Sequence, residues 1–148
     1  MLSIQQINTP HDFTTLSKEQ LVDFLHTHLD QFGDSKEAIA KCIDYAMQKD
    51  GGKGGFILIG YLNNVPVGTV VMNKTGMQDY IPENILVYIA VHSGYRGKGI
   101  GKQLIDEALA QSDGDVKLHV EYDNPAKRLY ERIGFTNKYA EMRYSKTV

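Results

Sequence analysis

Three glycines on alternate positions, Gly97, Gly99 and Gly101, are the residues whose spacing most directly suggests chemistry. They follow a nearly all-apolar run at 85–91, which predicts a strand buried on both faces. After them, apolar residues recur every four positions and predict a helix packed on a sheet. Unpaired N–H groups and the positive dipole end make a helix N-terminus an anion site, and glycines let the main chain approach the anion closely. The pattern predicts a phosphate-binding loop.

Two phosphate loops fit this stretch incompletely. A Walker A loop, G-x-x-x-x-G-K-[ST], could end at Gly101 and Lys102. However, Arg96 stands in place of its first glycine and Gln103 in place of its Ser/Thr. A dinucleotide fingerprint, G-x-G-x-x-G, has Lys102 at its last glycine position. Glu121, about twenty residues further on, mimics the ribose-binding acid of that fingerprint and keeps this hypothesis open.

A third loop type fits every position. Residues 96–101, Arg-Gly-Lys-Gly-Ile-Gly, resemble the R/Q-x-x-G-x-G/A loop of the GNAT superfamily, the acyl-CoA-dependent N-acetyltransferases. Residues 91–95 resemble the V-x-P-x-x approach to that loop, with Ser93 in place of the usual proline. Downstream, residues 124–135, Asn-Pro-Ala-Lys-Arg-Leu-Tyr-Glu-Arg-Ile-Gly-Phe, resemble the family segment N-x-x-A-x-x-L-Y-E-x-x-G-F. Two motifs in the family's order identify the chain as similar to GNAT proteins.

The resemblance implies how a coenzyme would bind. The N–H groups of residues 96–101 would hold the pyrophosphate of acetyl-CoA, and the side chains of Lys98 and Lys102 would either offset its charge or lie solvated. The main chain of Ile89 and Val91 would pair with the pantetheine arm like an added strand. The N–H of Val91 would stabilise the oxyanion formed when an amine attacks the thioester. The expected cofactor-binding residues are Ile89, Ala90, Val91, Arg96, Gly97, Lys98, Gly99, Ile100, Gly101, Lys102, Asn124, Ala126 and Tyr130.

Tyr130 is the expected general acid, and Val91 is the other expected catalytic residue. By the resemblance, the hydroxyl of Tyr130 faces the coenzyme sulfur and would donate a proton or hydrogen bond to the leaving thiolate. Helix periodicity alone favours an aromatic side chain that packs the short helix. The surrounding Leu-Tyr-Glu match favours the functional interpretation.

The chain departs from the family pattern at two positions. Many relatives carry a proton-relaying glutamate four residues before the strand's final valine, where this chain has Val87. The neighbouring candidates for a base are Tyr88, Glu83, His119 and Glu121. An amine that arrives neutral, or a water relay, would need no such base. The position of the family's usual asparagine is Asp123, so Asn124 beside it is expected to cap a helix, with a coenzyme contact as a second role.

Size and composition bound the class of protein. The chain has 148 residues, enough for one domain with a core, and its net charge of −2 provides no basic field for nucleic acid. No apolar run approaches a membrane span, and residues 1–6 do not resemble a signal peptide. The single cysteine, Cys42, excludes an internal disulfide and belongs to an apolar helical stripe. No metal-ligand spacing favours a metal site. We expect a cytoplasmic protein without nucleic-acid or membrane partners.

The other elements follow from periodicity, caps and turns. The predicted elements are a short strand near 2–7, a helix from Ser17 to Gly33, a second helix capped by Asp34, a hairpin of 56–62 and 65–72 joined by Asn63-Asn64, a strand at 116–121, a helix at 125–133 and a closing strand at 138–145. This order is that of GNAT domains. The resemblance implies an α/β (α+β) fold with a central, mixed, mostly antiparallel sheet of six or seven strands and about four helices, in one domain spanning 1–148.

The function implied by the resemblance is transfer of acetyl from acetyl-CoA to a primary amine, by direct attack in a ternary complex. The acceptor would be an unidentified small-molecule or peptide amine, and the enzyme class would be an acyltransferase acting on groups other than aminoacyl groups. A non-catalytic acyl-CoA-binding module of the same fold is the alternative, which the missing glutamate at Val87 supports. Many relatives dimerise, so a homodimer stays open.

Overall fold

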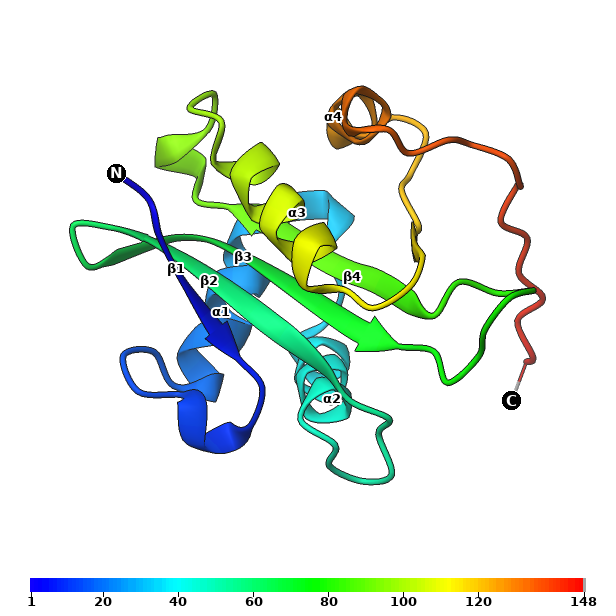
Figure 1. Cartoon of the computed structure of the whole chain (residues 1–148), viewed down its shortest axis with the longest axis horizontal. Helices are drawn as coiled ribbons and strands as arrows, with labels where there is room; N and C mark the ends of the chain where they lie inside the picture. The colour runs from blue at the N-terminus through cyan, green and yellow to red at the C-terminus, as the bar shows by residue number, and fades with distance from the viewer. Residues whose placement is uncertain (148) are drawn as a thin grey trace. The chain divides into compact units, whose positions relative to one another are not determined.

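A five-stranded sheet forms the centre of the computed structural model, which describes residues 1–147 (Figure 1). Its strands lie in chain order: β1 (Ser3–Ile7), β2 (Gly55–Leu62), β3 (Val65–Lys74), β4 (Asn84–Val91) and β5 (Val116–Leu118). The pairings from β1 to β4 are antiparallel, and β4 pairs with β5 in parallel. The predicted mixed, mostly antiparallel sheet is confirmed, but the expected six or seven strands are wrong, because the described residues form five.

The described residues form four α-helices, as the resemblance implied. They are α1 (Lys18–His28), α2 (Lys36–Ala46), α3 (Ile100–Gln111) and α4 (Ala126–Ile133). The described residues also form three short 3-10 turns: η1 (Pro10–Asp12) before α1, η2 (Asp30–Phe32) between α1 and α2, and η3 (Ser93–Tyr95) between β4 and α3. None of the helices in the described part of the chain has both the length and the apolar character needed to cross a membrane.

The first helical region differs from its prediction in two ways. The expected helix from Ser17 to Gly33 stops at His28, because Asp30 adopts a left-handed φ of 55° that no α-helix accommodates. Ser17 does form the predicted capping box with Gln20. The second helix is capped by Ser35 and not by Asp34, since the Ser35 hydroxyl accepts the N–H of Ala38. Asp34 is thereby free of the capping role.

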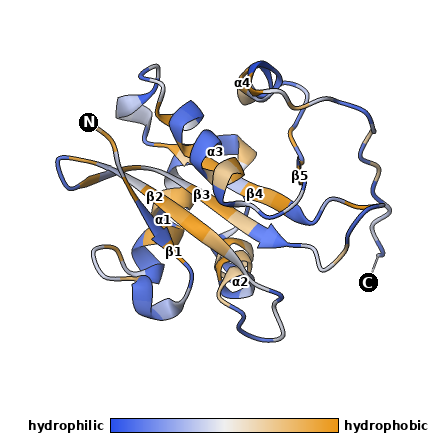
Figure 2. Cartoon of the chain, in the orientation of Figure 1, coloured by the Kyte–Doolittle hydropathy of each residue, from blue (hydrophilic) through white to orange (hydrophobic). Residues whose placement is uncertain are grey.

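The described residues form two compact units, Met1–Leu118 and the segment from His119 onward. In the first unit, α1 and α2 lie on one face of the sheet and α3 lies on the other (Figure 1). Alternate strand residues supply each face: Ile57, Ile59 and Val71 join the core under α1 and α2. A Cβ built on Gly68 would meet Leu104 of α3 at 2.7 Å. Figure 2 shows the hydrophobic residues concentrated along β2, β3 and β4, as expected for strands covered on both faces.

The hairpin of β2 and β3 turns at Asn63 and Asn64, as predicted. Both asparagines have positive φ, 49° and 64°, which is the backbone that a two-residue hairpin turn requires. The pairing of β2 with β3 shifts register between Gly60 and Tyr61, and β3 pairs in turn with β4. Along that second pairing, Val71 lies opposite Tyr88 whereas Met72 lies opposite Leu86, so Val87 is the extra residue of a β-bulge.

The two edges of β4 are used differently. On one side β3 accompanies the strand from Asn84 to Val91. On the other side β5 pairs only with Asn84, Ile85 and Leu86. Among the described residues, the stretch 87–91 therefore has a strand neighbour on one side only.

The second unit contains α4 and an extended tail. The predicted closing strand at 138–145 is wrong, because the described tail residues form no strand there. Its large apolar side chains are largely exposed, with Tyr139 at 78% and Met142 and Tyr144 at 90%. An alternating pattern produces a stable strand only where a neighbouring strand pairs with it. For the same reason the strand predicted at 116–121 shortens to Val116–Leu118.

Candidate functional site

The connection from β4 to α3 presents a row of unbonded backbone N–H groups. β4 ends at Val91, and a 3-10 turn, Ser93–Tyr95, leads into the glycine-rich loop. Gly97 and Gly99 have left-handed φ values of 80° and 78°, and Gly99 is the N-cap of α3 without a side-chain cap. Within the described residues, no hydrogen bond is recorded from the backbone N–H groups of 96–102, and the first bond of the helix runs from Gln103 to Gly99. This arrangement suits an anion.

The two lysines of the loop differ in their surroundings. Both follow glycines at the start of α3, and the loop residues 96–99 are exposed. The Nζ of Lys102 lies 2.7 Å from Asp106 one helical turn away, so a carboxylate already balances its charge. No ion pair is recorded for Lys98 in the described part of the chain. Lys98 is therefore the loop cation that is available to a phosphate.

Val91 and Ile89 direct their main-chain groups toward the unpaired edge of β4. The N–H of His92 donates to the carbonyl of Val67 beside β3 at 2.8 Å. Because main-chain groups alternate in direction along a strand, the N–H groups of Val91 and Ile89 point to the opposite edge. Buried Ala90, which lies between them, faces the core under α1 and α2. The structure thus offers the strand edge that the resemblance requires for an extended ligand.

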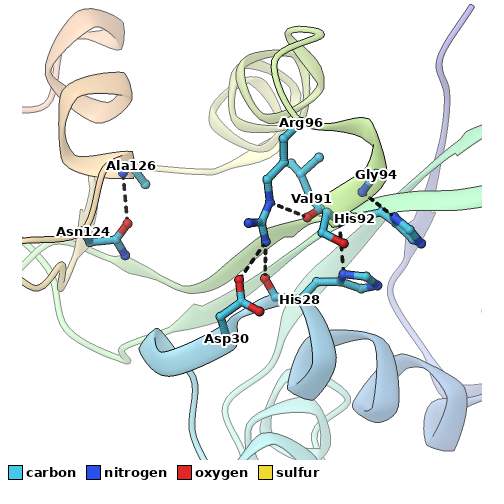
Figure 3. A network of polar contacts seen from close by, with 9 residues as sticks. His28, Asp30, Val91, His92, Gly94, Arg96, Asn124 and Ala126 are labelled. Carbon is cyan, nitrogen blue, oxygen red and sulfur yellow. Dashed lines mark hydrogen bonds and ion pairs between the residues drawn. The ribbon is translucent and has the colours of Figure 1, made fainter.

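The side chain of Arg96 turns away from the loop and joins three segments (Figure 3). Its Nε donates to the carbonyl of Val91 at 3.2 Å, and one terminal nitrogen donates to the carbonyl of His28 at 2.8 Å. The same nitrogen lies 3.3 Å from the carboxylate of Asp30. The sequence assigned Arg96 to the coenzyme loop and gave no local signal for His28 or Asp30, which lie 68 and 66 positions away. The hydrogen bonds of the guanidinium thus link the end of α1 to the end of β4.

A pair of imidazoles lies at the same junction. The rings of His28 and His92 are 4.2 Å apart between centroids. The Nδ1 of His28 accepts the N–H of Ser93 at 3.2 Å, and the Nδ1 of His92 accepts the N–H of Gly94 at 3.0 Å (Figure 3). Burial lowers the pKa of His28, and the neighbouring His92 and Arg96 lower it further. The neutral form of His28 is the one that accepts this hydrogen bond.

The four base candidates occupy different places. Glu83 precedes β4 and accepts the N–H of Asp115 at 2.9 Å, and this bond lowers the pKa of Glu83. It lies eight residues before Val91, which is roughly 25 Å along a strand, so Glu83 serves the turn to β5. Tyr88 donates its hydroxyl to Asp34 at 2.6 Å. In the second unit, His119 lies 3.9 Å from the carboxylate of Glu141, and the carbonyl of Glu121 accepts the N–H of Asn124.

The second unit contains the other predicted site residues. The side-chain oxygen of Asn124 accepts the N–H of Ala126 at 2.9 Å, and Pro125 already has helical angles, so the predicted cap is confirmed (Figure 3). Asn124 also borders a cavity of about 550 Å³ at the start of α4. Tyr130 is buried at 7% exposure and packs edge-on against Phe135. Burial raises the pKa of Tyr130 to about 12, so its hydroxyl keeps its proton at neutral pH.

No cluster of three or more His, Cys, Asp or Glu side chains that could hold a metal ion is found among residues 1–147. Cys42 lies in the packed stripe of α2, as predicted, and burial raises the pKa of its thiol to about 12. A thiol in this state is a poor nucleophile.

Comparison with known families agrees with this architecture. The model of the acetyltransferase (GNAT) domain family matches residues 53–137, which is more than half of the chain. The match includes the hairpin, β4, the glycine loop and α4. The chain belongs to the GNAT acetyltransferase domain family.

The sequence is also similar to that of an individual N-acetyltransferase. N-alpha-acetyltransferase 30 of Saccharomyces cerevisiae is 30% identical over 86 residues, which are 55% of this chain and 49% of the yeast protein. The match thus spans about half the length of that relative.

Solved structures share the fold at low identity. Aminoglycoside N-acetyltransferase AAC(6')-Iy, solved in complex with CoA, aligns with a TM-score of 0.71 at 18% identity over 100% of this chain and 96% of its own. Ribosomal-protein-alanine N-acetyltransferase from Brucella melitensis biovar Abortus 2308 aligns with a TM-score of 0.65 at 19% identity, over 99% of this chain and 100% of its own. These likenesses establish the GNAT fold.

The left-handed glycine at the helix start yields a stability prediction. A Cβ on Gly99 would meet no atom within 4 Å, so the cost of Gly99→Ala comes from its φ alone. We expect a loss of about 1 kcal/mol and a fall in melting temperature of about 2–4 °C. Gly94→Ala is the matched control, because Gly94 does not have a positive φ. Equal melting temperatures for Gly99→Ala and wild type would contradict the loop conformation.

The imidazole junction yields a pH prediction. Since the folded pKa of His28 is lowered, its contribution is fully present above the ordinary pKa of 6.5 and is lost as the pH falls below that value. We expect the melting temperature of wild type to fall more steeply than that of His28→Asn between about pH 7.5 and pH 5.5. The asparagine oxygen can accept the same N–H without titrating. His26→Asn, at an exposed position of the same helix, should keep the wild-type slope.

Proposed function

We propose that this chain is an N-acetyltransferase that moves an acetyl group from acetyl-CoA to a primary amine, by direct attack in a ternary complex. The observation that carries the proposal is the combination of an unpaired β4 edge with unbonded N–H groups at 96–102, after the turn that follows the strand. Membership of the GNAT domain family supports the same conclusion. The proposal takes the whole chain as one catalytic domain.

The coenzyme would follow the strand and then the loop. Its pantetheine arm would hydrogen-bond to the main chain of Ile89 and Val91, as an added strand does. Its pyrophosphate would accept the N–H groups of residues 96–102, with Lys98 balancing charge. Ile100, whose side chain is buried beneath α3, would contribute its N–H and no more. The CoA complex of the structurally similar aminoglycoside enzyme is consistent with a CoA-type ligand.

The reaction needs stabilisation of an oxyanion, a proton for the departing thiolate and removal of a proton from the amine nitrogen. The amine nitrogen forms a bond to the thioester carbon, and the resulting oxyanion would accept the N–H of Val91. The carbon–sulfur bond then breaks, and Tyr130 would donate its proton to the departing thiolate. Its raised pKa, about 12, keeps the hydroxyl protonated at neutral pH, so that it can donate a hydrogen bond to the thiolate. The nitrogen loses its own proton to solvent or to a base, Tyr130 regains a proton from solvent, and the products are an amide and CoA.

Amines are the common feature of the acceptors named for the relatives. The yeast relative is named as an N-alpha-acetyltransferase, and two structural neighbours are named for aminoglycoside and for ribosomal-protein alanine. We therefore propose a small-molecule or peptide amine as the acceptor. A non-catalytic acyl-CoA sensor is the second candidate, and the observation that favours it is Val87 at the position where many relatives carry glutamate.

Titration calorimetry and a CoA-release assay test the proposal. We expect acetyl-CoA to bind with roughly micromolar affinity and CoA to be released in the presence of some member of a broad amine panel. Gly99→Asp should weaken acetyl-CoA at least about tenfold, because a carboxylate would face the pyrophosphate. Gly51→Asp is the control, since Gly51 has a similar φ of 79° and equal space in a distant loop. Binding without release would favour the sensor, and no binding would refute both candidates.

Tyr130→Phe tests the general acid. We expect turnover to fall about ten- to a hundredfold while acetyl-CoA affinity stays within about twofold, because the hydroxyl acts on the leaving group. Tyr122→Phe, at a position 78% exposed in the same unit, is the control and should behave as wild type. Unchanged turnover for Tyr130→Phe would remove this residue from the mechanism.

A further inference from the structure

The bulge in β4 brings an unusual polar contact to the face under α1 and α2. Tyr88 follows the extra residue Val87, and both side chains pack with the core on this face. Tyr88 is only 7% exposed, yet its hydroxyl donates to Asp34 at 2.6 Å. Burial and the Asp34 carboxylate both raise the pKa of Tyr88, so the tyrosine stays a donor. A buried strand residue thus holds a carboxylate on the connection between η2 and α2.

The carboxylate of Asp34 is exposed, and one of its two oxygens has no bonding partner among the described residues. Asp34 itself is exposed, and Tyr88 bonds its Oδ2. Within residues 1–147, no hydrogen bond or ion pair is recorded for its Oδ1. The nearby Lys36 pairs instead with Asp23 at 3.0 Å. Asp34 therefore presents a fixed negative charge that no protein cation balances.

The same connection runs beside the end of β4 where the chemistry is proposed. Asp30, four residues earlier, is balanced by Arg96 at 3.3 Å, and Arg96 also holds the carbonyl of Val91. Tyr88 and Val91 lie three residues apart on one strand, which is roughly 10 Å. The connection that carries Asp34 thus contacts β4 at two places, directly at Tyr88 and through Asp30 and Arg96 at Val91.

We propose that Asp34 binds a second, non-reacting ammonium group of the acceptor, and that the acceptor class is therefore a diamine, polyamine or similarly dibasic molecule. This inference rests on the proposed function. An ammonium paired with a carboxylate keeps its proton, so it is not the nitrogen that attacks the thioester. The attacking nitrogen is a second amine of the same acceptor, placed next to the Val91 N–H. Tyr88 is a positioning residue, because it acts through Asp34.

A comparison of matched acceptors tests the proposal. The panel consists of straight-chain α,ω-diamines of two to eight methylenes and the monoamines of equal length. With wild type, we expect kcat/KM for the longer diamines to exceed that for the matching monoamines by roughly tenfold or more. 1,2-Diaminoethane should show no such advantage, since its two nitrogens are too close to reach both places. Asp34→Asn should raise KM for the long diamines about ten- to a hundredfold and leave the monoamines and acetyl-CoA unchanged.

Control variants test whether the diamine preference depends on the position of Asp34 or only on the total negative charge of the protein. Asp113→Asn removes one exposed negative charge elsewhere and should leave the diamine preference intact. Tyr88→Phe should raise KM for diamines by a smaller factor than Asp34→Asn. Tyr61→Phe is its match, because Tyr61 is equally buried on the same sheet face and donates to Gln5, and it should have no effect on KM.

The outcomes distinguish this inference from the proposed function. Equal kcat/KM for diamines and monoamines, or an Asp34→Asn variant that retains the diamine preference, would overturn the role of Asp34 while acetyl transfer stood. No CoA release from wild type with any amine would overturn both. Loss of the preference in Asp34→Asn, with monoamine turnover preserved, would support the assignment.

Discussion

The unsatisfied edge of β4 is the constraint on which the site depends. Buried main-chain groups need partners, and a strand flanked on one side only leaves alternate N–H and C=O groups open. β5 accompanies β4 for three residues and then stops, so Ile89 and Val91 face that open edge. After the turn at 92–95, whose N–H groups are bonded within the protein, come the unbonded amides before α3, where Gly97 and Gly99 adopt left-handed backbone. Two sets of main-chain donors result, and the proposed coenzyme would satisfy both.

Long-range polar contacts connect this surface with the N-terminal helices. Arg96 bonds to the end of α1 and to Val91, and His28 accepts an N–H from the turn after β4. Further along the same connection, Asp34 is bonded to Tyr88. The connection between α1 and α2, which carries the proposed ammonium-binding Asp34, is thereby fastened to the strand that borders the proposed coenzyme. Such fastening keeps two bound reactants in register without a large interface, which is how positioning lowers a barrier.

Local patterns predicted the parts of the fold that local physics controls. The glycine loop, the Asn63-Asn64 turn and the Asn124 cap each depend on the backbone preferences of a few adjacent residues, and the structure confirms all three. Sequence patterns did not predict the features that depend on residues far apart in the chain. The alternation at 138–145 predicts a strand, but a strand also needs a neighbour, and the described tail has none. The break after His28 and the contact between Tyr88 and Asp34, 54 residues apart, leave no periodic signal in the sequence.

Amide chemical shifts would show whether the backbone N–H groups after β4 hold the diphosphate of CoA. The measurement is a titration of the ¹⁵N-labelled protein with CoA, followed by two-dimensional NMR of its backbone amides. We expect the largest shifts to cluster at residues 96–102, with further shifts at Ile89 and Val91. If saturating CoA did not shift these amide resonances, or shifted only resonances from elsewhere in the chain, the proposed position of the diphosphate would be contradicted.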